Sequence, residues 1–265
     1  MRQTNHHFQV LICSLIIAAG PLFAGVKLQV RDGRPIVDDV YVNGHGPYRF
    51  LVDTGNNVNL IETGLARKIG MNPTFQIDFA SAAGKTPMPG SDGNEVALDP
   101  VKAGGQKFLF SGLEAIHSDS PDVQGVLGQW FLSGFDYLVD LRDKRLEFGK
   151  QDPNGTRAPF TMPNGRMAIS TSLGDLVLDS GASQLVLFGV EPDGGYGGKS
   201  FVRTLAGSQA VGMVSRKLII EGRNVWHGDA VTMPSRTEPG VAGLLPLGLF
   251  RAIYVCNSGG YVVFE

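Results

Sequence analysis

Two short triplets, each placing one carboxylate between an apolar run and a glycine, are the residues best placed to do chemistry. Asp53-Thr54-Gly55 follows Phe50-Leu51-Val52, and Asp179-Ser180-Gly181 follows Leu176-Val177-Leu178. A single aspartate at a turn is usually a cap or an Asx-turn. Two triplets 126 residues apart in matched surroundings instead indicate two copies of one unit. Two facing carboxylates can share a proton and activate a water molecule.

The segments that must position these carboxylates also recur in the same order. A second apolar run follows each triplet, and an apolar element bounded by glycine comes later in each half. These elements are Gly125-Val126-Leu127-Gly128 and Gly243-Leu244-Leu245. The distance from the aspartate to the first glycine is 72 residues in the first half and 64 in the second. This order predicts an internal duplication.

The rest of the pattern favours an all-β chain. Short Val-, Ile- and Leu-rich runs alternate with turns, and the chain has 36 Gly and 15 Pro among 265 residues. We expect short helices at 62–70, where Gly70 is a C-cap candidate, and around Trp130. The run Gln106–Ile116 is expected to be a strand. The predicted organisation is a signal peptide at 1–24, an N-terminal lobe at 25–150, a linker at 151–163 and a C-terminal lobe at 164–265.

The N-terminus has the pattern of a secretory signal. Arg2 is the only formal charge in residues 1–24, and an apolar stretch from Phe8 to Phe23 is interrupted by Gly20-Pro21. We expect cleavage after Ala24 and export to the periplasm or the medium; the alternative is an uncleaved N-terminal membrane anchor. Cleavage would leave Cys256 as a lone cysteine, expected to be a small buried hydrophobe, so the fold would rest on core burial.

Composition argues against several other functions. Charged residues are 18% of the chain and the net charge is −2, so we expect no nucleic-acid partner. The histidines are scattered without metal-ligand spacing, and we expect no metal. The glycine-rich segment 194–198 lacks the Lys-Ser/Thr of a phosphate-binding loop, so no cofactor is expected.

These residues resemble the aspartic protease superfamily, over nearly all of residues 25–265. The resemblance implies an all-β fold of two homologous retropepsin-like β-barrel lobes, a pepsin-like pseudo-dimer in one chain, with short helices. It implies that Asp53 and Asp179 are the catalytic dyad, which would bind and activate a water molecule. It also implies that the hydroxyls of Thr54 and Ser180 bond across the lobe interface. Gly55 and Gly181 would permit the tight turns, and their amides would donate to the carboxylates.

Several positions depart from the family pattern. Pro246 replaces the last glycine of the second apolar element, so this element is open to a different construction. Ala182 removes a hydroxyl donor beside one carboxylate, and Asn56 is a possible amide donor beside the other; together they favour a mildly acidic or neutral working pH. The candidate flap tip, Ala83-Gly84-Lys85, has no tyrosine and resembles the retroviral type or a solvated loop.

The sequence therefore predicts an exported aspartic endopeptidase acting on polypeptides, for which a monomer is sufficient. Two alternatives remain at this stage. One is a catalytically silent retropepsin-like protein that binds peptides or an envelope partner. The other is an unrelated all-β exported binding domain in which both triplets are ordinary turns. Which aspartate would carry the proton does not follow from the sequence.

Overall fold

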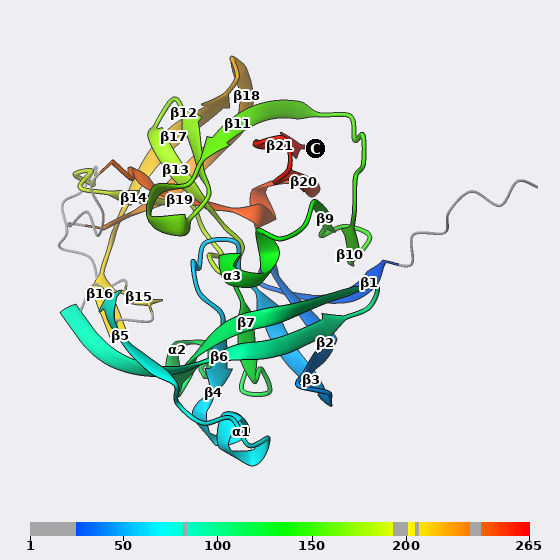
Figure 1. The fold of residues 1–265 in the computed structure, drawn as a ribbon. Coiled ribbons are helices and arrows are strands. Elements are labelled where there is room, and N and C mark those ends of the chain that lie inside the picture. Colours follow the sequence, from blue (N-terminus) through cyan, green and yellow to red (C-terminus); the bar gives the residue numbers. More distant parts are fainter. Residues whose placement is uncertain (1–24, 82–83, 193–200, 205–206, 234–239) are drawn as a thin grey trace, which may run out of the picture.

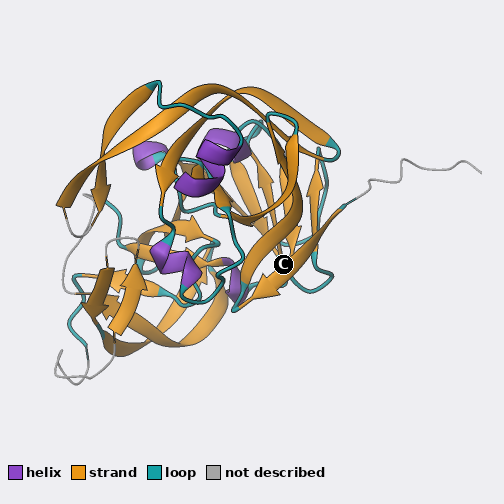
Figure 2. Ribbon diagram, turned by 90° about the horizontal axis from the view of Figure 1, so that it is seen from below, coloured by secondary structure: helices purple, strands orange, loops and turns teal. Residues whose placement is uncertain are grey.

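The computed structural model describes residues 25–81, 84–192, 201–204, 207–233 and 240–265. The predicted signal peptide at 1–24 lies outside these ranges. Strands dominate, and helices occur only as short segments (Figures 1 and 2), so the expected all-β class with short helices is confirmed. Within the described ranges, no helix is long and apolar enough to cross a membrane.

Among the residues described above, the first half contains ten strands and three helices. The strands are β1 (Val26–Arg31), β2 (Arg34–Val42), β3 (His45–Val52), β4 (Leu60–Glu62), β5 (Phe75–Ser81), β6 (Gly84–Leu98), β7 (Val101–Ser111), β8 (Gly125–Leu127), β9 (Tyr137–Asp140) and β10 (Arg145–Phe148). The helices are α1 (Thr63–Lys68), α2 (Glu114–His117) and α3 (Gln129–Leu132).

The second half contains the remaining strands and two 3-10 turns. The strands are β11 (Thr156–Thr161), β12 (Ala168–Thr171), β13 (Gly174–Asp179), β14 (Val186–Phe188), β15 (Phe201–Thr204), β16 (Gly207–Ala210), β17 (Gly212–Ile220), β18 (Arg223–Met233), β19 (Gly243–Pro246), β20 (Ala252–Cys256) and β21 (Tyr261–Phe264). The turns are η1 (Pro163–Gly165) and η2 (Leu247–Leu249).

The strand pairings around each triplet correspond one to one. β3, which leads into Asp53, is parallel to β8; β13, which ends at Asp179, is parallel to β19. The strand after the first triplet, β4, is antiparallel to β8 and parallel to β7. The strand after the second triplet, β14, is likewise antiparallel to β19 and parallel to β18. The register also corresponds, because Gly125 faces Phe50 and Gly243 faces Leu176.

One six-stranded antiparallel sheet joins the two halves. Its strand order is β1-β10-β9-β20-β21-β11. The pairing of β9 with β20, Tyr137–Asp140 against Ala252–Val255, connects the last hairpin of the first half to the last hairpin of the second. These strands lie together near the C-terminus in Figure 1. The halves are therefore linked by backbone hydrogen bonds as well as by the intervening chain.

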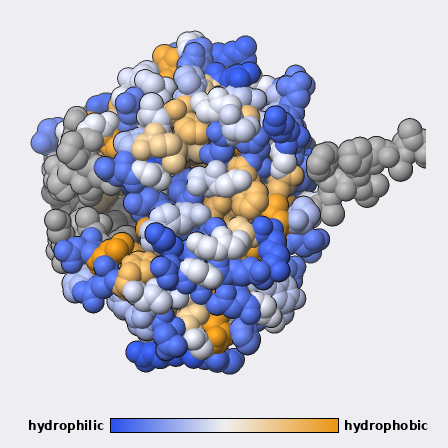
Figure 3. Space-filling view, viewed as in Figure 1, coloured by the Kyte–Doolittle hydropathy of each residue, from blue (hydrophilic) through white to orange (hydrophobic). Residues whose placement is uncertain are grey.

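Apolar side chains from both halves form a common core. The largest buried cluster includes Phe50 and Leu127 of the first half and Leu178 and Leu245 of the second. The face seen in Figure 3 is mainly polar, with several small apolar groups among the polar side chains. Cys256 is buried and not in a disulfide, as expected from the sequence.

The expectation of a strand over 106–116 was wrong, and the segment expected to be a linker contains a strand. The strand expected over 106–116 ends at Ser111, because Leu113 adopts a left-handed conformation (φ 56°) and helix α2 follows. The linker expected at 151–163 contains β11, whose Thr156–Pro159 pairs with β21 and whose Phe160-Thr161 pairs with β12. Buried Ala158 shows that this segment is part of the packed sheet.

The helix expected at 62–70 is present as α1, and its residues Leu65 and Ala66 are buried. Gly70 adopts a positive φ of 76°, which glycine tolerates better than residues with a side chain. The helix therefore ends where the sequence predicted.

Candidate active site

The aspartates lie at the ends of two strands that the repeated pairings place in the centre of the molecule. Asp53 follows β3, and its N–H donates to Leu127 O at 2.9 Å. Asp179 is the last residue of β13 and faces Pro246 of β19. Both aspartates are only partly exposed.

Buried hydroxyls connect the two loops reciprocally. Thr54 N donates to Ser180 Oγ at 2.9 Å, and Ser180 N donates to Thr54 Oγ1 at 3.1 Å. In turn, Thr54 Oγ1 donates to Leu178 O at 2.8 Å and Ser180 Oγ donates to Val52 O at 2.6 Å. Both residues are fully buried. Each loop is thus held by the main chain of the other, as the resemblance implied for these two hydroxyls.

The two glycines bring the carboxyl groups together. A β-carbon added to Gly55 would lie 2.3 Å from Asp179 Cγ, and one added to Gly181 would lie 2.7 Å from Asp53 Oδ2. Each glycine therefore lies directly against the carboxyl group of the opposite loop. The two carboxyl groups are close enough for each to shift the pKa of the other, and a hydrogen bond between them requires a proton on one of them.

Burial dominates the electrostatics of the pair. The pKa of Asp53 is well above its usual range, first because burial disfavours its charged form and then because Asp179 carries a like charge. Burial also raises the pKa of Asp179, but the nearby charge of Arg166 and two amide donors oppose that rise. The pair titrates as a unit and retains a proton at a pH where an exposed aspartate would have lost it.

The amide donors are distributed unequally. Asp179 Oδ1 accepts from Gly181 N at 2.8 Å and Ala182 N at 3.0 Å. Asp53 Oδ1 accepts from Gly55 N at 3.0 Å. Because amide donors stabilise a carboxylate over the neutral acid, Asp179 is the better anion and Asp53 the better holder of the proton.

Asn56 does not supply the carboxylate donor that its position suggested. Its Oδ1 accepts from Val58 N at 3.3 Å, and its Nδ2 is buried with no hydrogen-bond partner among the described residues. On the other loop, Ala182 has no hydroxyl, but its main-chain N–H donates to Asp179 Oδ1.

Buried amide side chains hold the first loop by hydrogen bonds to main-chain atoms. Asn59 Oδ1 accepts from Gly128 N at 3.0 Å, and Gln129 Nε2 donates to Thr54 O at 2.7 Å. Gln129 N also donates to Asn56 O at 2.8 Å. Asn59 and Gln129 were not identified from the sequence, because single amides in an apolar run have no motif of their own.

The second loop has apolar residues at the positions that correspond to this polar pair. Leu109 N donates to Asn59 O and Val231 N donates to Leu185 O, both at 2.9 Å, so Asn59 and Leu185 correspond. Leu185 is buried and has no amide to offer, while Pro246 at the Gly128 position has no N–H to donate. Pro246 lacks the donor and Leu185 lacks the acceptor of the bond that joins Gly128 to Asn59 in the first half. The pairing of β13 with β19 nevertheless keeps the same register as that of β3 with β8.

The flap candidate falls at a hairpin turn. Gly84 and Lys85 begin β6 and pair with Ser81 and Ala80 of β5, whereas Ala83 lies outside the described residues. A second hairpin, β15–β16, occurs in the other half. Both hairpins extend toward the same side of the molecule in Figure 1.

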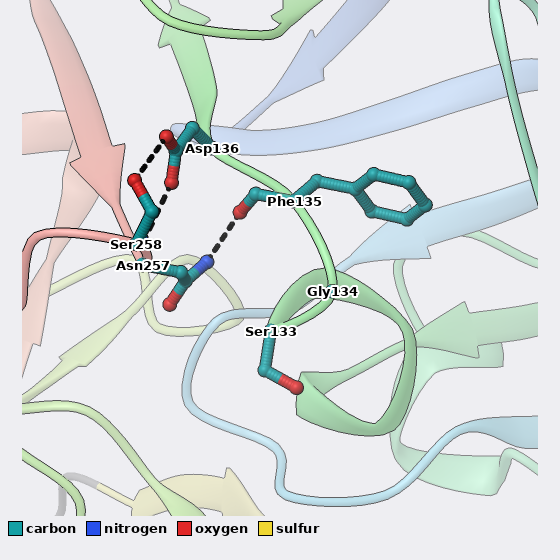
Figure 4. Close-up of a pocket in the computed structure, with 6 residues that line it drawn as sticks. All are labelled: Ser133, Gly134, Phe135, Asp136, Asn257 and Ser258. Atoms are coloured by element: carbon teal, nitrogen blue, oxygen red, sulfur yellow. Dashed lines mark hydrogen bonds between the residues drawn. The ribbon is translucent and has the colours of Figure 1, made fainter.

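A separate open cavity of about 310 Å³ lies between the halves, away from these loops. Its polar groups bond to each other (Figure 4): Ser258 N donates to Asp136 Oδ1 at 2.8 Å and Ser258 Oγ to Asp136 Oδ2 at 2.7 Å. Asn257 Nδ2 donates to Phe135 O. These bonds connect the two halves, and we interpret the cavity as structural.

In the part of the chain that is described, no group of three or more His, Cys, Asp or Glu side chains could hold a metal ion. The arrangement at the two loops is a pair of adjacent, largely buried carboxyl groups. Such a pair can take a proton from water with one member and donate one with the other.

Comparison with known proteins found one matching family and a similar solved structure. The aspartyl protease family matches residues 39–131, which include the first triplet but not the second. A solved retropepsin-like aspartic protease from Rickettsia conorii is similar at 20% identity and a TM-score of 0.35, covering 46% of this chain and 88% of that one. No curated protein matches. The family match agrees with the resemblance to aspartic proteases over residues 39–131.

Proposed function

We propose that this chain, whose first half matches the aspartyl protease family, is an exported aspartic endopeptidase with Asp53 and Asp179 as its dyad. The observation that carries the proposal is the reciprocal packing of each loop glycine against the opposite carboxyl group. The correspondence of the strand pairings supports the further proposal that the chain is an internal duplication of two retropepsin-like lobes. The proposed substrate is a polypeptide.

In the proposed reaction, the Asp179 carboxylate takes a proton from a bound water, whose oxygen attacks the peptide carbonyl carbon. Asp53 gives its proton to the carbonyl oxygen, forming a tetrahedral diol. Asp179 then gives the proton it took from water to the amide nitrogen, and one diol hydroxyl returns a proton to Asp53 as the C–N bond breaks. A carboxylic acid and an amine leave, and both aspartates regain their starting states. The assignment of Asp179 as base and Asp53 as acid rests on the amide donors, which favour charge on Asp179.

A silent peptide-binding protein of the same fold is the second candidate. The buried, unpaired amide of Asn56 favours it, because a polar group without a partner beside the dyad is unexpected in an optimised site. The close approach of the two carboxyl groups and the reciprocal hydroxyl bonds argue for catalysis, since binding a peptide requires neither.

The test is cleavage of a peptide library by the purified chain between pH 3 and pH 8. Asp53→Asn and Asp179→Asn are each expected to lower the rate roughly 10³-fold or more, because each removes one proton-transfer group. Asp175→Asn is the matched control, since Asp175 is exposed on the same strand, β13. Full activity in either dyad variant would overturn the proposed mechanism, and no cleavage by folded wild-type chain would favour the silent candidate.

Export is tested separately by fractionating cells that produce the chain and sequencing the N-terminus of the product. A mature N-terminus at Gly25 in the exported fraction is the expected result. A full-length product held in the membrane would support the anchor instead.

A further inference from the structure

Two turns of the same type precede corresponding strands in the two halves. Asp32-Gly33-Arg34 leads into β2, and Asn164-Gly165-Arg166 leads into β12. The φ angles agree closely: 50° at Asp32 and 75° at Gly33, against 50° at Asn164 and 75° at Gly165. In each half, the arginine therefore follows a turn with the same backbone conformation.

The strand register places each arginine in line with the aspartate of its own half. Leu178 N donates to Met167 O at 2.9 Å at the end of the β12–β13 ladder. The next pair of residues, beyond that bond, is Arg166 and Asp179. Arg166 is partly buried.

The same turn also contacts the other loop. Asn57, which is two residues after Gly55, donates from Nδ2 to Asn164 O at 3.0 Å. A β-carbon on Gly165 would lie 3.5 Å from Asn57 Cβ. The turn 163–166 thus lies against both loops, which is the place from which one charge can act on both carboxyl groups.

The two arginines have different electrostatic surroundings. Arg34 lies near Asp119 at 3.5 Å and Asp32 at 3.6 Å, two acids of its own half. The charge of Arg166 instead lowers the pKa of both Asp53 and Asp179. Among the described residues, the charged groups identified as acting on the dyad are its own two carboxyls and Arg166.

We propose that Arg166 is an electrostatic positioning residue of the active site, whose guanidinium stabilises the single negative charge that the dyad carries. The inference rests on the proposed dyad but adds a residue outside both triplets. Without this cation, two buried carboxyl groups would favour the fully protonated pair over a wider pH range, and the base would be lost. The cation keeps one carboxylate available while the other retains its proton.

The sign of the effect follows from the charge. A nearby cation favours the ionised form of a carboxyl group, so its removal raises both apparent pKa values of the pair. Both limbs of a pH–rate profile then move to higher pH, and activity below the optimum falls. Arg166→Lys keeps the charge and is expected to move the limbs less than a neutral residue does.

The test is a carboxyl ¹³C NMR titration of the full chain labelled at aspartate, which needs no catalytic activity. Arg166→Gln and Arg166→Met are the neutral variants, and Arg34→Gln is the matched control from the corresponding turn. Each neutral variant is expected to shift the dyad titrations upward by roughly half a pH unit or more, whereas Arg34→Gln leaves them in place. Thermal unfolding of each variant checks that it is folded.

Unchanged dyad titrations in either folded neutral variant would overturn the inference, as would an equal shift in Arg34→Gln. The NMR result also separates this inference from the proposed function. A chain that shows the shift but cleaves no peptide would retain Arg166 as the cation of the dyad while refuting the endopeptidase. A chain that cleaves peptides but shows no shift would support the endopeptidase and refute the role of Arg166.

Discussion

At the scale of single residues, the site depends on contacts in which each loop completes the other. Asp53 has Gly181 against its carboxyl group, and Asp179 has Gly55 against its own. Any side chain at either glycine would displace the opposite carboxyl group. The chemistry proposed for the dyad is therefore a property of the pair of loops, and neither triplet would have it alone.

The raised pKa of Asp53 predicts how stability depends on pH. Because its folded-state pKa lies above the unfolded value, its stabilising contribution is complete below the unfolded pKa and is lost as pH rises through the folded pKa. Asn cannot ionise, so Asp53→Asn is expected to gain stability relative to wild type as pH rises from about 4 to 8. Urea unfolding at several pH values measures this difference. A stability difference that stays constant across this range would contradict the prediction.

The hydroxyl bonds between the loops predict strong coupling. Thr54→Val leaves Ser180 N and Leu178 O without their partner in a buried site, and we expect a loss of about 1–3 kcal/mol in the free energy of unfolding. Ser180→Ala should cost a similar amount. Because the two residues share one network, the double variant is expected to lose less than the sum of the single losses.

A double-mutant cycle by urea denaturation measures this coupling. Thr74→Val together with Thr171→Val provides a control pair, since each bonds only within its own half. Strict additivity of Thr54→Val and Ser180→Ala would show that the two loops are not held together in the way described.

At the scale of elements, the two strand crossings use different chemistry in the same register. The first has a hydrogen bond from Gly128 N to the side chain of Asn59; the second has Leu185 and Pro246 at the corresponding positions. A polar pair and an apolar pair are both satisfied, because neither leaves a buried donor or acceptor unmatched.

Exchanging these residues is expected to destabilise both halves. Asn59→Leu leaves Gly128 N buried without an acceptor, and Leu185→Asn places an amide beside a proline that cannot donate to it. Each is expected to cost about 1–3 kcal/mol in the free energy of unfolding. Thermal or urea unfolding measures both, with Leu185→Met as the apolar control at the second site. A neutral Leu185→Asn would show that the second crossing contains an unrecognised polar partner.

At the scale of the whole molecule, the six-stranded sheet joins the halves. β9 lies between β10 of its own half and β20 of the other, and the largest core cluster includes residues from both. Separating the halves would expose the edge of β9 and part of that core, which is unfavourable for either half alone.

The chain is therefore expected to unfold in a single cooperative transition. Scanning calorimetry measures this through the ratio of the calorimetric to the van't Hoff enthalpy, which should be near one. Weakening the junction by Val139→Pro, in the centre of the β9–β20 pairing, should lower the midpoint while keeping one transition. Two resolved transitions in the wild-type chain would show that the halves fold independently.

The sequence by itself determined the all-β class, the two triplets and the correspondence of the elements around them. These features follow from local rules: alternating apolar runs, glycine at turns, and an aspartate after each apolar strand. The short helix α1 and its end at Gly70 were predicted for the same reason.

Only the tertiary structure decided which residues from distant parts of the chain meet. It joined β9 to β20, made β11 a strand through its pairing with β21 and β12, and placed Asn59 and Gln129 beneath the first loop. It also brought Arg166 to the dyad while Arg34, from the same type of turn, faces other acids. Burial and charge depend on neighbours in space, and the local sequence pattern contains no information about those neighbours.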